Sequence, residues 1–176
     1  SIRRQRQMCI RDRIRRGSVK NIYLVRHATA VKRSENLSDF QRNLVKKGIK
    51  EAEDIAKVLK KKSQSINLMI SSPANRALET AHIFARILDY PIQKIKIKEE
   101  LYNSSAAQSL LEVIRELDNA INSVMLFGHD PQFSDFAGEF IEGFNENIPK
   151  SGIVAARTLR KNWTNPVSYT HLTLPT

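Results

Sequence analysis

The sequence predicts an α/β protein, a three-layer α/β/α sandwich around a mostly parallel central sheet. Short apolar segments alternate along the chain with longer segments whose apolar residues recur at helical spacing, and this alternation is typical of parallel strands joined by helices. Three of the apolar segments lead into polar residues, at 26–27, 71–73 and 128–130. Because parallel strands of an open sheet end at one edge, we expect these three ends to lie together.

Strands are expected at residues 20–26, 67–71, 93–98, 123–127 and 151–159. The first, second and fourth are short apolar runs, as in strands buried on both faces. Residues 93–98 alternate Ile with Lys, as in a half-exposed strand. Residues 28–45 form a polar loop of the long kind that is often functional, and residues 99–103 form a second loop.

Helices are expected at 46–61, 72–88, 107–121 and from 131 to about 141. Ser72 and Pro73 supply the N-cap and first-turn proline of the second helix. The expected inward face of the first helix consists of Ile49, Ala52, Glu53, Ile55, Ala56 and Leu59. That of the second helix consists of Ala77, Leu78, Ala81, Phe84, Ala85 and Leu88.

The composition indicates one soluble domain. A chain of 176 residues, 41% hydrophobic and 27% charged, is long enough to bury a hydrophobic core. No apolar run approaches the roughly 18 residues of a membrane span, and no apolar core of a signal peptide follows the basic N-terminus. We therefore expect a cytoplasmic monomer that does not associate with membranes.

Both ends of the chain read as translated sequencing adapter. One choice of codons for residues 3–12 has a reverse complement that translates as Val-Ser-Tyr-Thr-His-Leu-Thr-Leu-Pro-Thr, which is residues 167–176. The nucleotide sequence of these codons also resembles a transposase-type adapter used in sequencing libraries. We therefore expect residues 1–16 and 167–176 to be non-native, and the domain to span residues 17–166 and to be truncated before a final strand.

If both ends are adapter-derived, the net charge of the native residues is lower than that of the whole chain. Residues 1–16 carry seven Arg and one Asp, so excluding them reduces the net charge of +11 to about +5. Nucleic-acid binding is attractive at +11 and is not expected at +5, because no aromatic residues interleave with the basic ones. Cys9 lies in the same excluded segment, which leaves residues 17–166 without a thiol.

Four residues are candidates for chemistry: Arg26 and His27 at the end of the first strand, Arg76 one turn into a helix, and His129 after the most apolar strand. Taken alone, each of these residues could equally well have a structural role or be solvated instead of functional. Together they can bind the oxygens of a phosphoryl group and leave one imidazole free to attack. Phosphoryl transfer needs such positioning and cationic stabilisation around a nucleophile.

Three motifs of this chain resemble those of the histidine phosphatase (phosphoglycerate mutase-like) superfamily. They are Leu24-Val25-Arg26-His27-Ala28, Ser71-Ser72-Pro73 with Arg76, Ala77 and Thr80, and Gly128-His129-Asp130-Pro131. The resemblance covers residues 20–160. The small size, the Arg-His-Ala variant and the loop pattern Ser38-Asp39, Arg42, Gly48 are most similar to the SixA branch, the phosphohistidine phosphatases.

The resemblance implies a phosphoglycerate mutase-like fold in which His27 is the nucleophile that becomes transiently phosphorylated. Arg26, Arg76 and His129 would hold the phosphoryl oxygens, and Arg42 would add a contact to phosphate or substrate. His27 must then be neutral, with its other ring nitrogen held by a partner that the sequence does not identify. No metal or cofactor is implied, and the sequence has no cluster of metal ligands.

Glu100 is the candidate general acid, because most members of the superfamily protonate the leaving oxygen with a carboxylate near this place. The alternative is that Glu99 and Glu100 are a solvated strand end. SixA-like enzymes resemble one another in lacking an obvious donor, which suits a phosphoramidate that leaves as an easily protonated nitrogen base. His82 is expected to be structural, since it lies six residues past Arg76 on the same helix.

The expected function is that of a metal-independent phosphatase that works through a phosphohistidine intermediate. Protein phosphohistidine is the expected substrate, and a histidine-phosphorylated phosphorelay protein is the expected partner. The alternative substrates are small phosphorylated metabolites or phosphoserine-type esters; the chain lacks the insertions with which larger relatives enclose them. A non-catalytic phosphate-binding module ranks below both, because all four core residues are present.

Overall fold

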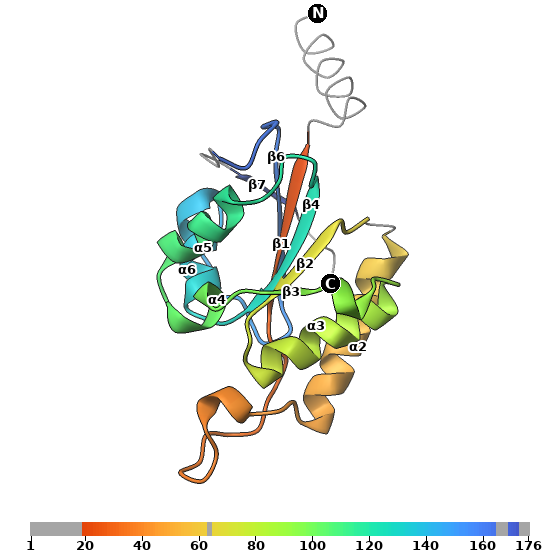
Figure 1. Ribbon diagram of the computed structural model, residues 1–176, viewed down its shortest axis with the longest axis vertical. Coiled ribbons are helices and arrows are strands. Elements are labelled where there is room, and N and C mark those ends of the chain that lie inside the picture. The colour runs from red at the N-terminus through yellow and green to blue at the C-terminus, as the bar shows by residue number, and fades with distance from the viewer. Residues whose placement is uncertain (1–18, 63–64, 165–168, 173–176) are drawn as a thin grey trace, which may run out of the picture.

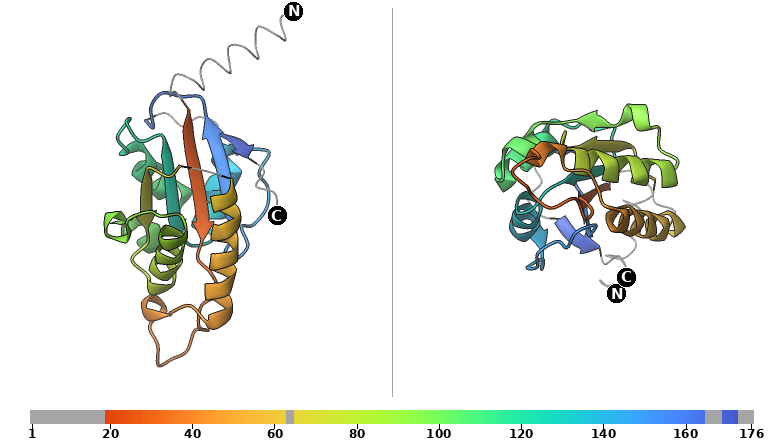
Figure 2. Two further views of the ribbon diagram at one scale, coloured as in Figure 1. Left: turned by 90° about the vertical axis from the view of Figure 1, so that its right-hand side faces the viewer. Right: turned by 90° about the horizontal axis from the view of Figure 1, so that it is seen from below.

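The computed structural model describes residues 19–62, 65–164 and 169–172, which form one sheet between two layers of helices (Figures 1 and 2). Among these residues the sheet has seven strands in the order β3-β2-β4-β1-β6-β7-β5. No helix in the described ranges is long and apolar enough to cross a membrane. The predicted α/β sandwich is confirmed.

The sheet is built outward from β1 (Lys20–Arg26). On one side of β1 the parallel strands β4 (Ser123–Gly128), β2 (Leu68–Ser71) and β3 (Lys96–Ile97) follow in turn. On the other side β6 (Ile153–Thr158) runs antiparallel to β1, and β7 (Tyr169–Leu172) antiparallel to β6. The last strand, β5 (Ile141–Glu142), pairs in parallel with β7. The parallel part therefore contains every strand end that carries the predicted site.

Two pairs of helices cover the faces of the sheet. Helices α2 (Lys46–Lys61) and α3 (Asn75–Ile87) lie on one face, and α5 (Ala107–Arg115) and α6 (Gln132–Phe140) lie on the other (Figure 1). Three short helices complete the described chain: η1 (Asp39–Gln41), η2 (Ile92–Lys94) and α4 (Glu100–Asn103).

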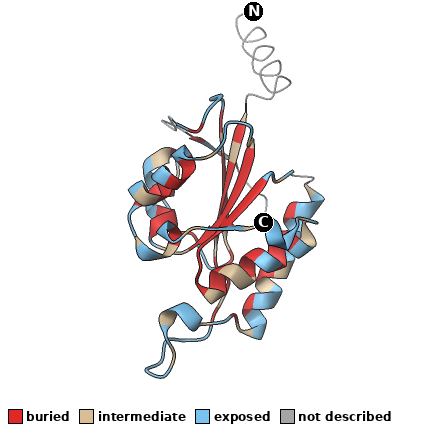
Figure 3. Cartoon of the chain, in the orientation of Figure 1, coloured by how far each residue is buried: buried red, intermediate tan, exposed pale blue. Residues whose placement is uncertain are grey.

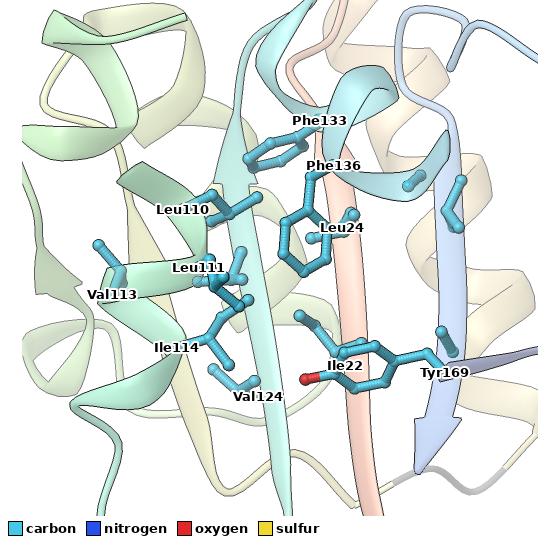
Figure 4. Close-up of a cluster of buried hydrophobic side chains, with 14 of the residues drawn as sticks. Ile22, Leu24, Leu110, Leu111, Val113, Ile114, Val124, Phe133, Phe136 and Tyr169 are labelled. Carbon is cyan, nitrogen blue, oxygen red and sulfur yellow. The ribbon is translucent and has the colours of Figure 1, made fainter. Parts of the chain in front are cut away.

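Successive side chains of β1 point to opposite faces and join two separate cores. Ile22 and Leu24 pack with Phe133, Phe136 and neighbouring side chains under α5 and α6 (Figure 4), whereas Tyr23 and Val25 belong to the cluster under α2 and α3. The central strands are accordingly buried over most of their length (Figure 3). Burial on both faces fixes the register of β1, and thereby fixes where Arg26 and His27 leave the sheet.

The inward face predicted for α2 is partly wrong. Ala52, Ala56 and Leu59 are buried as expected, but Ile49 is 41% exposed and Ile55 36% exposed. Gly48 occupies the buried face instead, and a Cβ atom there would overlap the backbone carbonyl of Thr29. The helix is therefore rotated so that its smallest residues approach the chain after β1.

Four other expectations about helices, strands and loops differ from the structure. Helix α3 has its N-cap at Ala74 and not at Ser72. The segment 93–98, expected to be a half-exposed strand, begins inside η2, and only Lys96–Ile97 are paired, as β3. The expected loop at 99–103 contains the short helix α4, and α5 ends at Arg115, six residues early.

The C-terminal region extends the sheet past residue 166. Tyr169 to Leu172 form β7 against β6, at the place where a missing final strand was expected, and Tyr169 is fully buried. This pairing does not test the adapter origin of residues 167–176, which stays a prediction. The predicted N-terminal tail and Cys9 lie outside the described residues.

Candidate active site

The site lies where β1, β2 and β4 end side by side. Arg26 is paired with Gly128, and Ser71 with Phe127, so the residues that follow each strand are neighbours. The amide of His27 donates to the Gly128 carbonyl at 3.0 Å. The expected meeting of the three sequence segments is thus observed.

His27 is 8% exposed and has one ring nitrogen fixed by the backbone. Its Nδ1 lies 2.8 Å from the Ala28 carbonyl oxygen. A carbonyl can only accept, so Nδ1 carries the proton and Nε2 has the free lone pair. The Thr80 hydroxyl accepts from the Ala28 amide at 3.1 Å and donates to the Arg76 carbonyl at 2.7 Å, which holds this loop against α3.

Arg76 faces the nucleophilic nitrogen of His27. Its Nε donates toward His27 Nε2 at 3.3 Å, which agrees with an unprotonated Nε2. Burial, together with the nearby guanidinium groups of Arg76, Arg26 and Arg42, lowers the pKa of His27 to about 4, although its bond to Ala28 opposes the shift. His27 is therefore neutral at pH 7.

His129 packs beside His27, with ring centroids 5.2 Å apart. Its Nε2 lies 2.8 Å from the Ser72 hydroxyl, which also accepts from the amide of Ala74 at 3.3 Å. Burial, and then the charge of Arg76, lowers the pKa of His129 to about 3. Ser72 can thus donate to a neutral Nε2, and this leaves the proton of His129 on Nδ1, a buried atom with no partner among the described residues.

Arg26 is held from the opposite side. Its Nη1 donates to the Ile148 carbonyl at 2.6 Å and lies 3.0 Å from Asp130 Oδ2. The Ser134 hydroxyl donates to Asp130 at 2.8 Å and accepts from the Ile148 amide at 2.9 Å. Arg26 Nε is the second buried donor of the site that lacks a partner within the described chain. An anion that accepted from Arg26 Nε and His129 Nδ1 would satisfy both atoms.

The loop at 28–45 brings Asp39 to the site, a residue of the SixA-like loop pattern to which no role was assigned from sequence. Asp39 Oδ2 lies 2.9 Å from Arg76 Nη2, and Asp39 Oδ1 lies 2.7 Å from Arg42 Nη1 and 3.0 Å from Arg33 Nε. Although partial burial opposes it, hydrogen bonds and charge from Arg42, Arg76 and Arg33 hold the pKa of Asp39 well below its usual range. Arg42 is further held by the Val31 carbonyl at 2.7 Å. It reaches the site through Asp39 and through its charge on His27.

Among the described residues, Glu100 forms no salt bridge or side-chain hydrogen bond with the four core residues. It is exposed at the start of α4, and its backbone carbonyl accepts from Gln132 Nε2 at 3.0 Å. Two residues on, Tyr102 faces the site instead, with its ring edge-on to His129 at 5.7 Å. The general-acid role of Glu100 stays a prediction. His82 is exposed on α3, and its structural role stays a prediction.

The arrangement can bind a phosphoryl group and attack it. The free lone pair is on His27 Nε2, and the donors near it are Arg76, Arg26 and the neutral His129, with the charge of Arg42 behind Asp39. Phosphoryl transfer requires a nucleophile with cationic and N–H donors of this kind. Within the residues that the structure describes, no group of three or more His, Cys, Asp or Glu could hold a metal ion. The expected absence of a metal is not tested by this and stays a prediction.

Comparisons with known proteins agree with this geometry. A family model described as histidine phosphatase superfamily (branch 1) matches residues 22–141. The structure is similar to a chain from Agrobacterium tumefaciens described as a phosphohistidine phosphatase SixA, with 28% identity, a TM-score of 0.67, and coverage of 78% of this chain and 90% of that one. No relative among curated proteins matches the chain.

Two further solved structures share the fold at lower identity. One is a protein histidine phosphatase SixA complexed with tungstate, at 22% identity and a TM-score of 0.74, covering 87% of this chain and 94% of that one. The other is an Escherichia coli chain described as an alpha-ribazole-5'-P phosphatase, at 15% identity and a TM-score of 0.66, covering 89% and 96%. Relatives of this fold thus differ in the molecule that they are described as acting on.

Proposed function

Because this chain belongs to the histidine phosphatase superfamily, we propose that it hydrolyses phosphohistidine on a protein through a phosphorylated His27. The observation that carries the proposal is the 2.8 Å bond from His27 Nδ1–H to the Ala28 carbonyl. It leaves Nε2 unprotonated and facing Arg76 Nε, as an attacking imidazole requires. The similarity to the chain described as SixA supports the same substrate class.

The reaction proceeds in two displacements. His27 Nε2 attacks phosphorus, the Nε2–P bond forms, and the bond from phosphorus to the substrate nitrogen breaks; that nitrogen takes a proton from solvent. Water then attacks the phosphorylated His27, which releases inorganic phosphate and restores the imidazole. Arg26, Arg76 and His129 bind the phosphoryl oxygens in both steps, and Arg42 stabilises their charge from behind Asp39.

The carboxylates beside the site support a nitrogen leaving group over an alkoxide. An alkoxide needs a proton donor, and Asp39 stays ionised because three arginines hold its pKa low. Asp130 accepts from Arg26 and from Ser134. Among the described residues, no other carboxylate contacts Arg26, His27, Arg76 or His129 in a salt bridge or hydrogen bond. A phosphoramidate requires no acid of this kind, since its nitrogen is readily protonated.

Trapping of the phosphoenzyme tests the nucleophile. Enzyme mixed with radiolabelled phosphoramidate is denatured at alkaline pH, where phosphohistidine survives. Wild-type protein and the control His82→Ala, which changes an exposed histidine on α3, are expected to carry label, and His27→Ala none. Label that persists in His27→Ala would reject the assignment, and binding of phosphate with no label in any variant would indicate a non-catalytic module.

Turnover tests the substrate class. A histidine-phosphorylated peptide is expected to be hydrolysed faster than sugar phosphates or a phosphoserine peptide. The reverse order would favour the alternative of metabolite or ester hydrolysis. A histidine-phosphorylated phosphorelay protein is the partner that we propose, with the enzyme acting as a cytoplasmic monomer.

A further inference from the structure

Four aromatic rings form a row that leads from the nucleophile to the surface. The centroids of His27 and His129 lie 5.2 Å apart, those of His129 and Tyr102 lie 5.7 Å apart, and those of Tyr102 and Phe40 lie 5.3 Å apart. The last two contacts are edge-to-face. The row begins at His27, which is 8% exposed, and ends at Phe40, which is 38% exposed.

The outer two rings are attached to the phosphate-binding groups. Phe40 follows Asp39 in η1, and Asp39 binds Arg76 through both its carboxylate and its carbonyl oxygen. The Tyr102 hydroxyl lies 3.5 Å from the same carboxylate. The two rings therefore hold a defined position beside Arg76 and His129, although they come from segments sixty residues apart.

The rim of the site differs between its two sides. Beside Arg26 it is polar, because the Asp130 carboxylate and the Ile148 carbonyl approach the guanidinium. Beside His129 it includes the Tyr102 ring, which packs in turn against Phe40, next to the Asp39 carboxylate that binds Arg76. A planar apolar group carried by a bound phosphoryl group would gain edge-to-face contacts only on the second side.

We propose that Phe40 and Tyr102 form the leaving-group subsite and select substrates whose phosphoryl group is attached to a planar aromatic heterocycle such as imidazole. The proposal rests on the proposed phosphatase function and assigns the part of the site that recognises the substrate beyond its phosphoryl group. The imidazole of phosphohistidine lies against the two rings while the phosphorus–nitrogen bond breaks. Alkyl esters and simple phosphoramidates lack a ring to place there.

The contribution of the substrate's aromatic ring can be measured with two substrates that share the same type of scissile bond. Phosphoimidazole and the phosphoramidate ion both have a phosphorus–nitrogen bond, and only the first carries an aromatic ring. The ratio of their kcat/KM values is expected to fall about fivefold in Phe40→Ala and in Tyr102→Ala. Tyr102→Phe keeps the ring and is expected to retain the ratio. Ile92→Ala, which shortens an exposed side chain on η2, is the surface control.

The outcomes separate the two proposals. A wild-type enzyme that turns over neither substrate contradicts the phosphatase function and this inference with it. An enzyme that turns over both, and whose ratio is unchanged in Phe40→Ala and Tyr102→Ala, contradicts only the subsite. A ratio that falls equally in Phe40→Leu supports the requirement for a ring over one for apolar volume, whereas full rescue by leucine overturns it.

Discussion

The Nδ1 atom of His27 lies 2.8 Å from the carbonyl oxygen of Ala28, the next residue in the chain. A contact between adjacent residues costs little chain entropy and is set by the path of the backbone as it leaves β1. Thr80 fixes that path by accepting from the Ala28 amide at 3.1 Å. The tautomer of the nucleophile is therefore determined by the end of a buried strand and by one hydroxyl of α3.

The first prediction concerns the protonation of His27. Its pKa is lowered to about 4, first by burial and then by three arginines. Its ring resonances in a nitrogen-15 NMR titration are therefore expected to remain those of the neutral Nδ1–H tautomer from pH 8 down to pH 5. A titration midpoint of His27 between pH 6 and pH 7 would contradict the lowered pKa.

The same shift predicts loss of stability in acid. The folded pKa lies below the ordinary value of 6.5, so between pH 6.5 and pH 4 the unfolded chain binds more protons than the folded one. The free energy of unfolding is therefore expected to fall as the pH falls through this window, by up to about 3 kcal/mol from His27. Urea unfolding at a series of pH values measures the loss, which His27→Gln is expected to reduce.

A second prediction follows from Ser72 and His129. Without the hydroxyl, His129 Nε2 loses its 2.8 Å partner, and the proton is no longer confined to Nδ1. Ser72→Ala is expected to lower kcat/KM about fivefold and to move the nitrogen-15 shifts of His129 toward a mixture of tautomers. Ser71→Ala is the matched control, because the Ser71 hydroxyl donates to the Ser72 carbonyl at 2.9 Å. Unchanged His129 shifts in Ser72→Ala would exclude this positioning role.

A third prediction concerns Asp39. Its carboxylate joins Arg76 and Arg42, at 2.9 and 2.7 Å, and so orients the guanidinium that faces His27. Asp39→Asn removes the negative charge that holds them and is expected to reduce kcat/KM between about tenfold and a hundredfold, mostly through KM. Tighter binding of inorganic phosphate by this variant would show instead that Asp39 competes with phosphate for Arg76.

Arg33→Ala is the control for the Asp39 experiment. Arg33 also contacts Asp39, at 3.0 Å, but its side chain is 80% exposed. Exposed ion pairs contribute little, so kcat/KM is expected to stay within about twofold of wild type.

The convergence of Arg26, Arg76 and His129 on His27 could be predicted from sequence because buried apolar runs define where β1, β2 and β4 end. The roles of Ser72 and Tyr102 could not. A serine before a proline satisfies the helix N-cap pattern whether its hydroxyl bonds the helix or a histidine 57 positions away. Tyr102 lies in a short helix with no apolar period that would predict its direction, and the family resemblance indicates a carboxylate here, which favours Glu100.

The rotation of α2 was mispredicted for a related reason. A hydrophobic pattern predicts burial for Ile49 and Ile55 and not for Gly48, since larger side chains bury more apolar area. The backbone of the loop after β1 comes so close to the helix that only a residue without a Cβ fits. The distance between α2 and the loop after β1 depends on both segments, so it cannot be predicted from the sequence of either one alone.

Two glycine substitutions test that close approach. In Gly48→Ala the new Cβ meets the backbone carbonyl of Thr29, which cannot move without displacing the loop after His27; a loss of about 2 kcal/mol is expected. In Gly138→Ala, on the exposed side of α6, nothing lies within 4 Å of the new Cβ, and a gain of about 0.5 kcal/mol is expected from helix propensity. Thermal unfolding should therefore shift in opposite directions. Equal Tm values for the two variants would mean that α2 can withdraw from Thr29 without cost.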